Sequence, residues 1–373
     1  MLRLRPANHL KARGFPALLG LALAVVAAVL ACAVANAWAA RPSDPDAGSQ
    51  QPLRIMRVPQ AVTAAGPLKP VNVLVADTGL DLTHPDLAPR LFSLPAAVPA
   101  PNPDGVPDPG TVSAGAPGWD LIGSLEPSDL APDPDPSDPP TGTGHGTAVA
   151  GLLGAAWDNS IGGAGVAPNA RFVALRTCWD DDQCYQYVQA AAFEWASARK
   201  VRVVSMSWLA GDPEPEFGDA IRNAKRTLFV AIPSGPEPGS SIDGEGESRA
   251  PCTLRRAPNV LCVTTSSPSN RPSCGAYGRR SVDVAVPVEN SITTTNGGGF
   301  GPTSCATSYA APTAAGVATI LFGAEPKATP KQVKQAIIDG AHRVSAWRNK
   351  TVSGGVINVK AALKILRRRL PHR

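Results

Sequence analysis

The sequence predicts a three-layer α/β/α fold built around a mainly parallel sheet. Six short runs are rich in apolar and β-branched residues. They lack the alternation of apolar and polar residues that is typical of a strand with one solvent-exposed face, so both faces of each strand are expected to be buried. Helix-like stretches lie between or after them, and this order is typical of a parallel sheet. With 373 residues, 43% of them hydrophobic, the chain can bury one large core.

The predicted elements follow one another along most of the chain. The six strands are expected at 71–76, 171–176, 201–206, 227–232, 259–264 and 281–286. The helices are expected at 147–153, 185–199, 216–226, 308–322 and 331–341. In sheets of this kind functional groups gather at the carboxyl ends of the strands, and Asp77 directly follows the first strand.

The first 39 residues have the features of an export signal. They combine a basic start, an apolar stretch from 15 to about 34, and the small-residue sequence Ala37-Trp38-Ala39. We expect cleavage after Ala39. Two alternatives stay open, namely an uncleaved anchor, because about 20 apolar residues can span a bilayer, and lipidation of Cys32. The membrane is a partner only in those two cases. All three readings predict a secreted, periplasmic or otherwise extracytoplasmic protein.

Beyond the leader we expect a short N-terminal segment (40–54), one main domain (55–360) and a basic C-terminal tail (361–373). The formal net charge of +5 becomes +1 once the four basic residues of the leader are subtracted. No general basic surface is left for nucleic acid. Nothing marks a second core, and we expect a monomer.

Six cysteines remain after the leader, and an even number in an exported protein favours disulfides. Their spacing suggests three local pairs, Cys178 with Cys184, Cys252 with Cys262, and Cys274 with Cys305. A metal site is the alternative, but no Cys-x-x-Cys pair occurs and no histidine accompanies the cysteines. We therefore predict disulfides and no metal at the cysteines.

The segment 91–140 holds 13 of the 39 prolines and is predicted to be a long surface loop. Four acidic residues in it could offer hard oxygen ligands to a structural calcium ion. They are Asp129, Asp133, Asp135 and Asp138. A solvated, proline-stiffened loop is the other interpretation, and we expect no cofactor.

Three short motifs carry a carboxylate, an imidazole and a hydroxyl. Asp77 lies in Val-Ala-Asp-Thr-Gly, His145 in Gly-His-Gly-Thr, and Ser308 in Thr-Ser-Tyr-Ala-Ala-Pro. Of the five histidines, two lie near the chain ends, His342 follows a helical stretch, and His84 precedes a proline in a turn-like sequence. His145 is therefore the candidate general base, at the start of a buried helix.

With these motifs in the order Asp, His, Ser, the chain resembles the subtilisin-like serine proteases (subtilases, peptidase S8). The sequences Gly165-Val-Ala-Pro-Asn-Ala170, Val204-Ser-Met-Ser207 and Pro258-Asn-Val-Leu261 resemble further landmarks of that family. The resemblance runs from about residue 55 to 358. It implies the subtilisin-like form of the α/β/α fold and an endopeptidase that cleaves polypeptides through an acyl-enzyme.

The resemblance assigns a role to each member of the triad. His145 would take the proton of Ser308, and Asp77 would orient the imidazole and stabilise its charged form. Ser304, in Thr303-Ser304-Cys305-Ala306, is the competing nucleophile. Only Ser308 is followed four residues later by the proline of the family pattern.

The resemblance also indicates the substrate-binding residues. The segment Ser207, Trp208, Leu209 and Ala210 would line the pocket for the residue before the cleaved bond. Leu209 stands where the family commonly has glycine, which predicts a narrowed pocket and a preference for small residues such as alanine.

One departure from the family concerns the oxyanion hole. Ser234 and Gly235 follow the strand 227–232, and Gly235 takes the position of the family's oxyanion-hole asparagine. Only about thirty residues separate Ala39 from the first catalytic strand, so a folding prodomain is very short or missing. An alternative function is therefore a subtilase-fold binding or scaffold protein with weak or no turnover.

Overall fold

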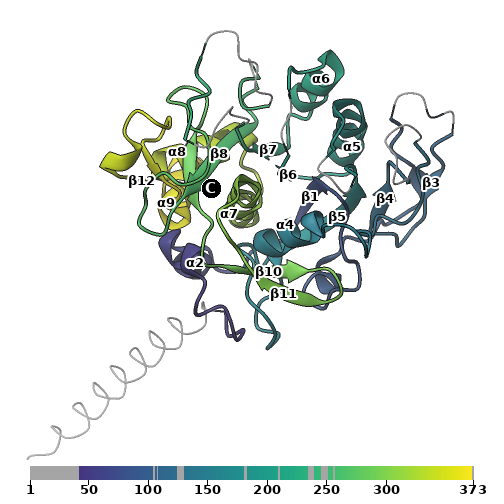
Figure 1. Cartoon of the computed structure of the whole chain (residues 1–373), viewed down its shortest axis with the longest axis horizontal. Helices are drawn as coiled ribbons and strands as arrows, with labels where there is room; N and C mark the ends of the chain where they lie inside the picture. The colour runs from purple at the N-terminus through teal and green to yellow at the C-terminus, as the bar shows by residue number, and fades with distance from the viewer. Residues whose placement is uncertain are drawn as a thin grey trace, which may run out of the picture. The chain divides into compact units, whose positions relative to one another are not determined.

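The computed structural model describes residues 42–371, except 104–105, 107, 124–129, 180–182, 209–210, 234–238, 245–250 and 255–256. The predicted signal segment and Cys32 lie outside the described residues. Within the described part, a nine-stranded sheet has the order β12-β13-β9-β8-β7-β6-β1-β5-β4 (Figure 1). Every neighbouring pair from β13 to β4 is parallel, and only β12 runs antiparallel to its neighbour. The mainly parallel sheet predicted from the sequence is confirmed.

The strands of the sheet are β1 (Val71–Asp77), β4 (Gly118–Asp120), β5 (Ala170–Arg176), β6 (Val203–Met206), β7 (Leu228–Ala231), β8 (Val260–Ser266), β9 (Val284–Pro287), β12 (His342–Arg343) and β13 (Gly355–Val356). Six of them, β1 and β5 to β9, coincide with the predicted apolar runs to within about three residues at each end, whereas no predicted run corresponds to β4, β12 or β13. Two small ribbons lie outside it, β2 (Val98–Pro99) with β3 (Thr111–Val112), and β10 (Ile292–Thr295) with β11 (Gly299–Pro302).

The α-helices are α2 (Gln51–Ile55), α3 (Val58–Ala65), α4 (His145–Gly154), α5 (Gln186–Ala198), α6 (Pro215–Asn223), α7 (Ala310–Ala324), α8 (Pro330–Gly340) and α9 (Val359–Arg369). The described residues also form three short 3-10 helices, η1 (Ala88–Arg90), η2 (Thr307–Tyr309) and η3 (Ser345–Trp347). Among the described helices, none combines the length and the apolar character needed to cross a bilayer.

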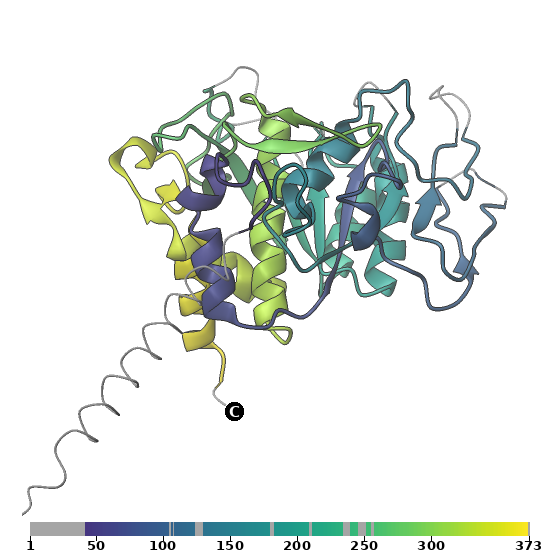
Figure 2. The same cartoon turned by 90° about the horizontal axis from the view of Figure 1, so that it is seen from below.

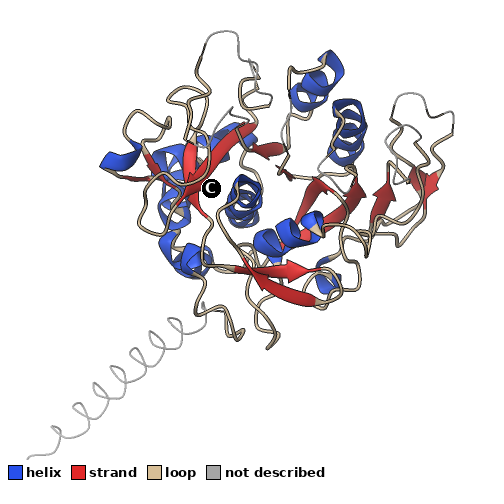
Figure 3. Ribbon diagram, viewed as in Figure 1, coloured by secondary structure: helices blue, strands red, loops and turns tan. Residues whose placement is uncertain are grey.

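Helices cover both faces of the sheet because successive side chains of each strand point to opposite sides. Along β1, Val73 and Val75 join the core formed with α3, α4, α7, α8 and α9, whereas Leu74 and Ala76 join the core formed with α5 and α6. Figure 3 shows helices on both sides of the strands, and Figure 2 shows α7 from the side. This helix is apolar on all sides and is buried over almost its whole length.

Three of the predicted boundaries differ from the structure. Within 91–140, β4 pairs with β5 as a sheet strand, because Trp119 and its apolar neighbours are buried. The N-terminal segment is part of the domain, since Leu53 of α2 lies in the main core. The predicted tail instead forms α9, where Leu363 and Leu366 are buried and the basic residues lie on the outer side. The sequence pattern predicts a basic tail here because the amphipathic helix α9 is rich in arginine and has few apolar positions.

All three predicted disulfides are present. Cys178–Cys184, Cys252–Cys262 and Cys274–Cys305 close loops with sequence separations of 6, 10 and 31 residues. A cross-link restricts the unfolded chain, and it restricts it more when the closed loop is longer.

The loop lengths predict a ranking of stabilities. Replacing Cys274 and Cys305 together by serine should lower the free energy of unfolding by roughly 2–4 kcal/mol, and by more than the same change at Cys178 and Cys184. Urea unfolding of both double variants without reductant measures the two losses. An equal or larger loss for the shorter loop would contradict the loop-entropy explanation.

Candidate functional site

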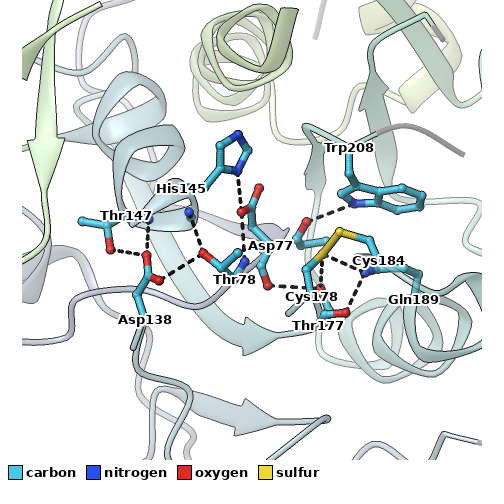
Figure 4. Close-up of polar contacts among 12 residues, drawn as sticks. Asp77, Thr78, Asp138, His145, Thr147, Thr177, Cys178, Cys184, Gln189 and Trp208 are labelled. Atoms are coloured by element: carbon cyan, nitrogen blue, oxygen red, sulfur yellow. Dashed lines mark hydrogen bonds and ion pairs between the residues drawn. A yellow bond between two sulfur atoms is a disulfide. The ribbon is translucent and has the colours of Figure 1, made fainter. Parts of the chain in front are cut away.

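Asp77 and His145 form the centre of the candidate site. Asp77 is the last residue of β1, and His145 is the first residue of α4. The imidazole Nδ1 lies 2.7 Å from Asp77 Oδ1, which also accepts a hydrogen bond of 2.9 Å from the Thr78 amide. Figure 4 shows the second ring nitrogen turned away from Asp77. A carboxylate on Nδ1 therefore fixes the ring so that Nε2 can exchange a proton with another group.

Glycines allow β1 and α4 to approach this closely. A Cβ on Gly146 would overlap the carbonyl oxygen of Gly79 and lie 3.2 Å from the Cβ of Asp77. Gly144, the residue before α4, has a φ of +66°, and a Cβ there would crowd the side chain of Asn296 at 3.2 Å. Gly146 thus allows the contact with Asp77, and Gly144 allows the left-handed backbone that begins α4.

The predicted nucleophile lies in the short turn that leads into α7. Ser308 is the middle residue of η2, is partly buried, and lies two positions before Ala310, the first residue of α7. Both η2 and α7 pack against α4, the helix that carries His145. Ser304, the competing candidate, is exposed on the preceding segment. This topology brings the element bearing Ser308 to the element bearing His145.

A buried carboxylate lies behind the Asp77–His145 pair, on the left of Figure 4. Asp138 is 4% exposed, and its Oδ2 accepts hydrogen bonds from the amide (3.1 Å) and hydroxyl (2.8 Å) of Thr147. Its Oδ1 accepts from the Thr78 hydroxyl at 3.1 Å, and Thr78 Oγ1 accepts from the Gly146 amide at 3.0 Å. Asp138 thereby links the end of β1 to the first turn of α4. Its partner Thr78 directly follows Asp77, and its partner Thr147 lies two residues after His145.

Burial raises the pKa of Asp138 to about 6, although the hydrogen bonds from Thr147 and Thr78 lower it, and the nearby charge of Asp77 raises it further. A folded-state pKa above the unfolded value means that the folded protein keeps this proton longer. The stability that this site contributes is therefore complete below about pH 4 and is lost as the pH rises through about 6.

The other side of Asp77 is held by the segment after β5. The Asp77 carbonyl oxygen accepts hydrogen bonds from the amides of Thr177 (2.9 Å) and Cys178 (3.1 Å). Gln189 of α5 donates to the Thr177 carbonyl at 3.1 Å, and Cys178 is cross-linked to Cys184. Cys305, three residues before Ser308, is cross-linked to Cys274. Two of the disulfides thus flank the elements that carry Asp77 and Ser308.

The predicted substrate-binding residues are described only in part. Ser207 and Trp208 directly follow β6, and each is 3% exposed. The Trp208 indole donates to the Ala76 carbonyl at 3.1 Å and packs near Phe217, so its side chain faces the core rather than a substrate. The Ser207 hydroxyl has no hydrogen-bond partner among the described residues. Leu209, Ala210, Ser234 and Gly235 lie outside the described residues.

The three described aspartates among those considered for calcium are held in different ways. Asp133 and Asp135 accept hydrogen bonds from Asp135 and Ser137 in successive turns, whereas Asp138 is turned inward to the two threonines. Asp129 lies outside the described residues. Within the described ranges no group of three or more His, Cys, Asp or Glu side chains is arranged to hold a metal ion.

The sequence pattern does not single out Asp138 as a neighbour of the triad, because it lies in the proline-rich segment among aspartates that are expected to be solvated. Its partners, Thr78 and Thr147, each directly follow or nearly follow a motif residue. His84, expected in a turn, is fully buried; its Nδ1 accepts from the Asp86 amide and its Nε2 lies 2.9 Å from the Gly299 carbonyl oxygen. The contact between His84 and Gly299 links this turn to the β10–β11 ribbon.

The raised pKa of Asp138 predicts a specific pH dependence of stability. The unfolding free energy of the native protein minus that of the Asp138→Asn variant should fall by about 2 kcal/mol between pH 4 and pH 7. Urea unfolding at several pH values measures this difference, with Asp135→Asn, in the same segment, as the surface control. A difference that stays constant over this range would show that Asp138 does not titrate there.

The comparisons with known proteins agree with this geometry. Residues 69–359 match the model of the Subtilase family. Subtilisin E from Bacillus subtilis is 30% identical over 297 residues, which are 78% of this chain but only 65% of that relative, so the chain spans less than two thirds of its length.

Subtilisin BL from Lederbergia lenta is 30% identical over 233 residues, 61% of this chain and 81% of that relative. The solved structure of a protease from Pseudoalteromonas arctica shares the fold, with a TM-score of 0.69 at 22% identity over 87% of this chain and 99% of that chain. Because the family model matches most of the chain, from β1 to the start of α9, the protein belongs to the subtilase family.

Proposed function

We propose that this protein is an exported serine endopeptidase that cleaves peptide bonds with Asp77, His145 and Ser308. The observation that carries the proposal is the 2.7 Å bond between Asp77 Oδ1 and His145 Nδ1. A buried carboxylate in this position has a chemical use, since it selects the imidazole tautomer that accepts a proton at Nε2.

The reaction follows from the chemistry of the three groups. His145 Nε2 takes the Ser308 proton while Oγ attacks the peptide carbonyl carbon, and Asp77 stabilises the imidazolium that forms. The imidazolium then gives its proton to the leaving amine, and an acyl-enzyme remains. Water, deprotonated by His145, hydrolyses the ester and restores Ser308. The position of Ser308 just before α7 supports a role for its amide as a donor to the oxyanion, with the positive end of the helix dipole behind it.

Export is part of the proposal. The leader-like sequence of residues 1–39 supports it, and so do the three disulfides, which form and persist in oxidising compartments. The substrate is a polypeptide, and Leu209, in place of the family's glycine, favours a small residue such as alanine before the cleaved bond.

The second candidate function is binding or scaffolding with little or no turnover. The observation that favours it is Gly235 at the position of the family's oxyanion-hole asparagine, because glycine has no side chain to donate to the oxyanion.

An active-site label tests the triad. The purified protein should react with a fluorophosphonate and hydrolyse peptides, and Ser308→Ala should lose both activities almost completely, because the triad acts as one unit. Ser304→Ala is the matched control and should keep both. Labelling that persists in Ser308→Ala but is lost in Ser304→Ala would move the nucleophile, and folded native protein that never labels would favour the binding function.

The oxyanion hole has its own test. If the donor is missing, Gly235→Asn should raise kcat by about 10²–10³ at unchanged KM, which is the size of the effect known for the subtilisin asparagine. Steady-state kinetics on one peptide substrate measures both constants. No change, in a variant whose structure shows the asparagine facing Ser308, would mean that another group already fills this role.

A further inference from the structure

Three arginines converge on a hollow at the end of the sheet far from the triad. The hollow has a volume of about 570 Å³, and Arg279, Arg343 and Arg348 line it from three separate segments. Arg343 lies in β12, Arg348 follows η3, and Arg279 lies in the loop before β9. In the sheet order β13 is five strand spacings from β1, which is roughly 24 Å. The hollow is therefore separate from the site built around Asp77.

None of these three guanidinium groups pairs with a carboxylate among the described residues. Among the described residues that line the hollow there is no aspartate or glutamate. Elsewhere the same structure pairs its arginines, as in Arg176–Asp120 (2.9 Å), Arg222–Asp219 (2.7 Å) and Arg369–Asp339 (2.7 Å). Three positive charges around one hollow repel one another, and the cost is offset when an anion enters.

The turn that lines the hollow is held together by its own buried hydroxyl groups. Thr351 and Ser353 are each 3% exposed, and their hydroxyl oxygens lie 3.3 Å apart. Thr351 Oγ1 accepts from the Gly354 amide at 3.1 Å, and Ser353 Oγ accepts from the Gly355 amide at 3.3 Å. Trp347 is buried directly before Arg348 and packs with Val356. The arginines therefore extend from a fixed base, which lowers the entropy cost of gathering them around a ligand.

We propose that this hollow is a binding site for a multiply charged oxyanion of the phosphate or polycarboxylate class. A guanidinium presents parallel N–H groups that match two oxygens of a phosphate or carboxylate, so arginine rather than lysine suits this recognition. Several guanidinium groups can contact different oxygens of one such anion, whereas a monovalent ion such as chloride can neutralise only one of them. The site makes no use of the triad and does not depend on the proposed peptidase activity.

Calorimetric titration tests the proposal with inorganic phosphate and with citrate, each at an ionic strength kept constant with sodium chloride. At least one of the two anions should bind saturably with one site per chain. The affinity should fall at least tenfold in the Arg343→Ala, Arg348→Ala double variant, because both guanidinium contacts are lost. Arg271→Ala removes an exposed arginine on the loop after β8 that has no ion pair among the described residues, and it should bind as the native protein does.

A double lysine variant, Arg343→Lys with Arg348→Lys, separates recognition from charge. It keeps both positive charges but lacks the planar fork, so we expect at least a threefold loss of affinity. All these positions are exposed, and thermal melting confirms that each variant is folded before titration. The proposal is overturned if neither anion binds saturably at constant ionic strength, if the double alanine variant binds as tightly as the native protein, or if Arg271→Ala weakens binding equally.

Discussion

The rest of the site depends on the close contact between the end of β1 and the start of α4. The 2.7 Å bond between Asp77 and His145 requires a strand end and a helix end to meet almost backbone to backbone. Gly146 removes the side chain that would overlap Gly79, and Asp138 satisfies the donors of Thr78 and Thr147 at the same junction. Since these donors are buried, losing their acceptor would leave unpaired polar groups at the junction. Close backbone packing and buried hydrogen bonds therefore both depend on the few residues next to Asp77 and His145.

The three elements of the site come from distant parts of the chain, and each is fixed by a different kind of interaction. β1 is central in the sheet, between β5 and β6, so Asp77 is held by strand pairing on both sides. His145 is held by α4, in which the carbonyl oxygens of Thr147 and Ala148 accept hydrogen bonds from the hydroxyl groups of two β10 threonines. Ser308 follows a disulfide-bonded cysteine and precedes the most deeply buried helix. A covalent tie is useful at η2, because this turn has no strand partner of its own.

The sequence allowed much of the fold to be predicted, for a physical reason. A strand buried on both faces needs a continuous apolar run, so 71–76 and 171–176 could be recognised without knowledge of their neighbours. The local disulfide pairs could also be predicted, because short sequence separations between the cysteines limit the possible partners. β4 could not be found in this way: it has only three residues, and its identity as a strand depends on pairing with β5 across fifty residues of chain.

The parts of the site that the sequence did not reveal depend on the direction of side chains. Trp208 follows Ser207 in a segment expected to line the substrate pocket, but alternation along an extended chain turns its indole to the core, where Ala76 accepts its N–H. Asp138 shares a run of acidic and proline residues with Asp133 and Asp135, and only the fold distinguishes the buried carboxylate from the exposed ones. The ionised form of Asp138 is disfavoured by burial and by the charge of Asp77, yet a neutral side chain in its place would accept fewer hydrogen bonds from the threonines. Geometry explains why a carboxylate suits this position, since its two oxygens can bind both Thr78 and Thr147 and so hold the two halves of the Asp77–His145 junction together.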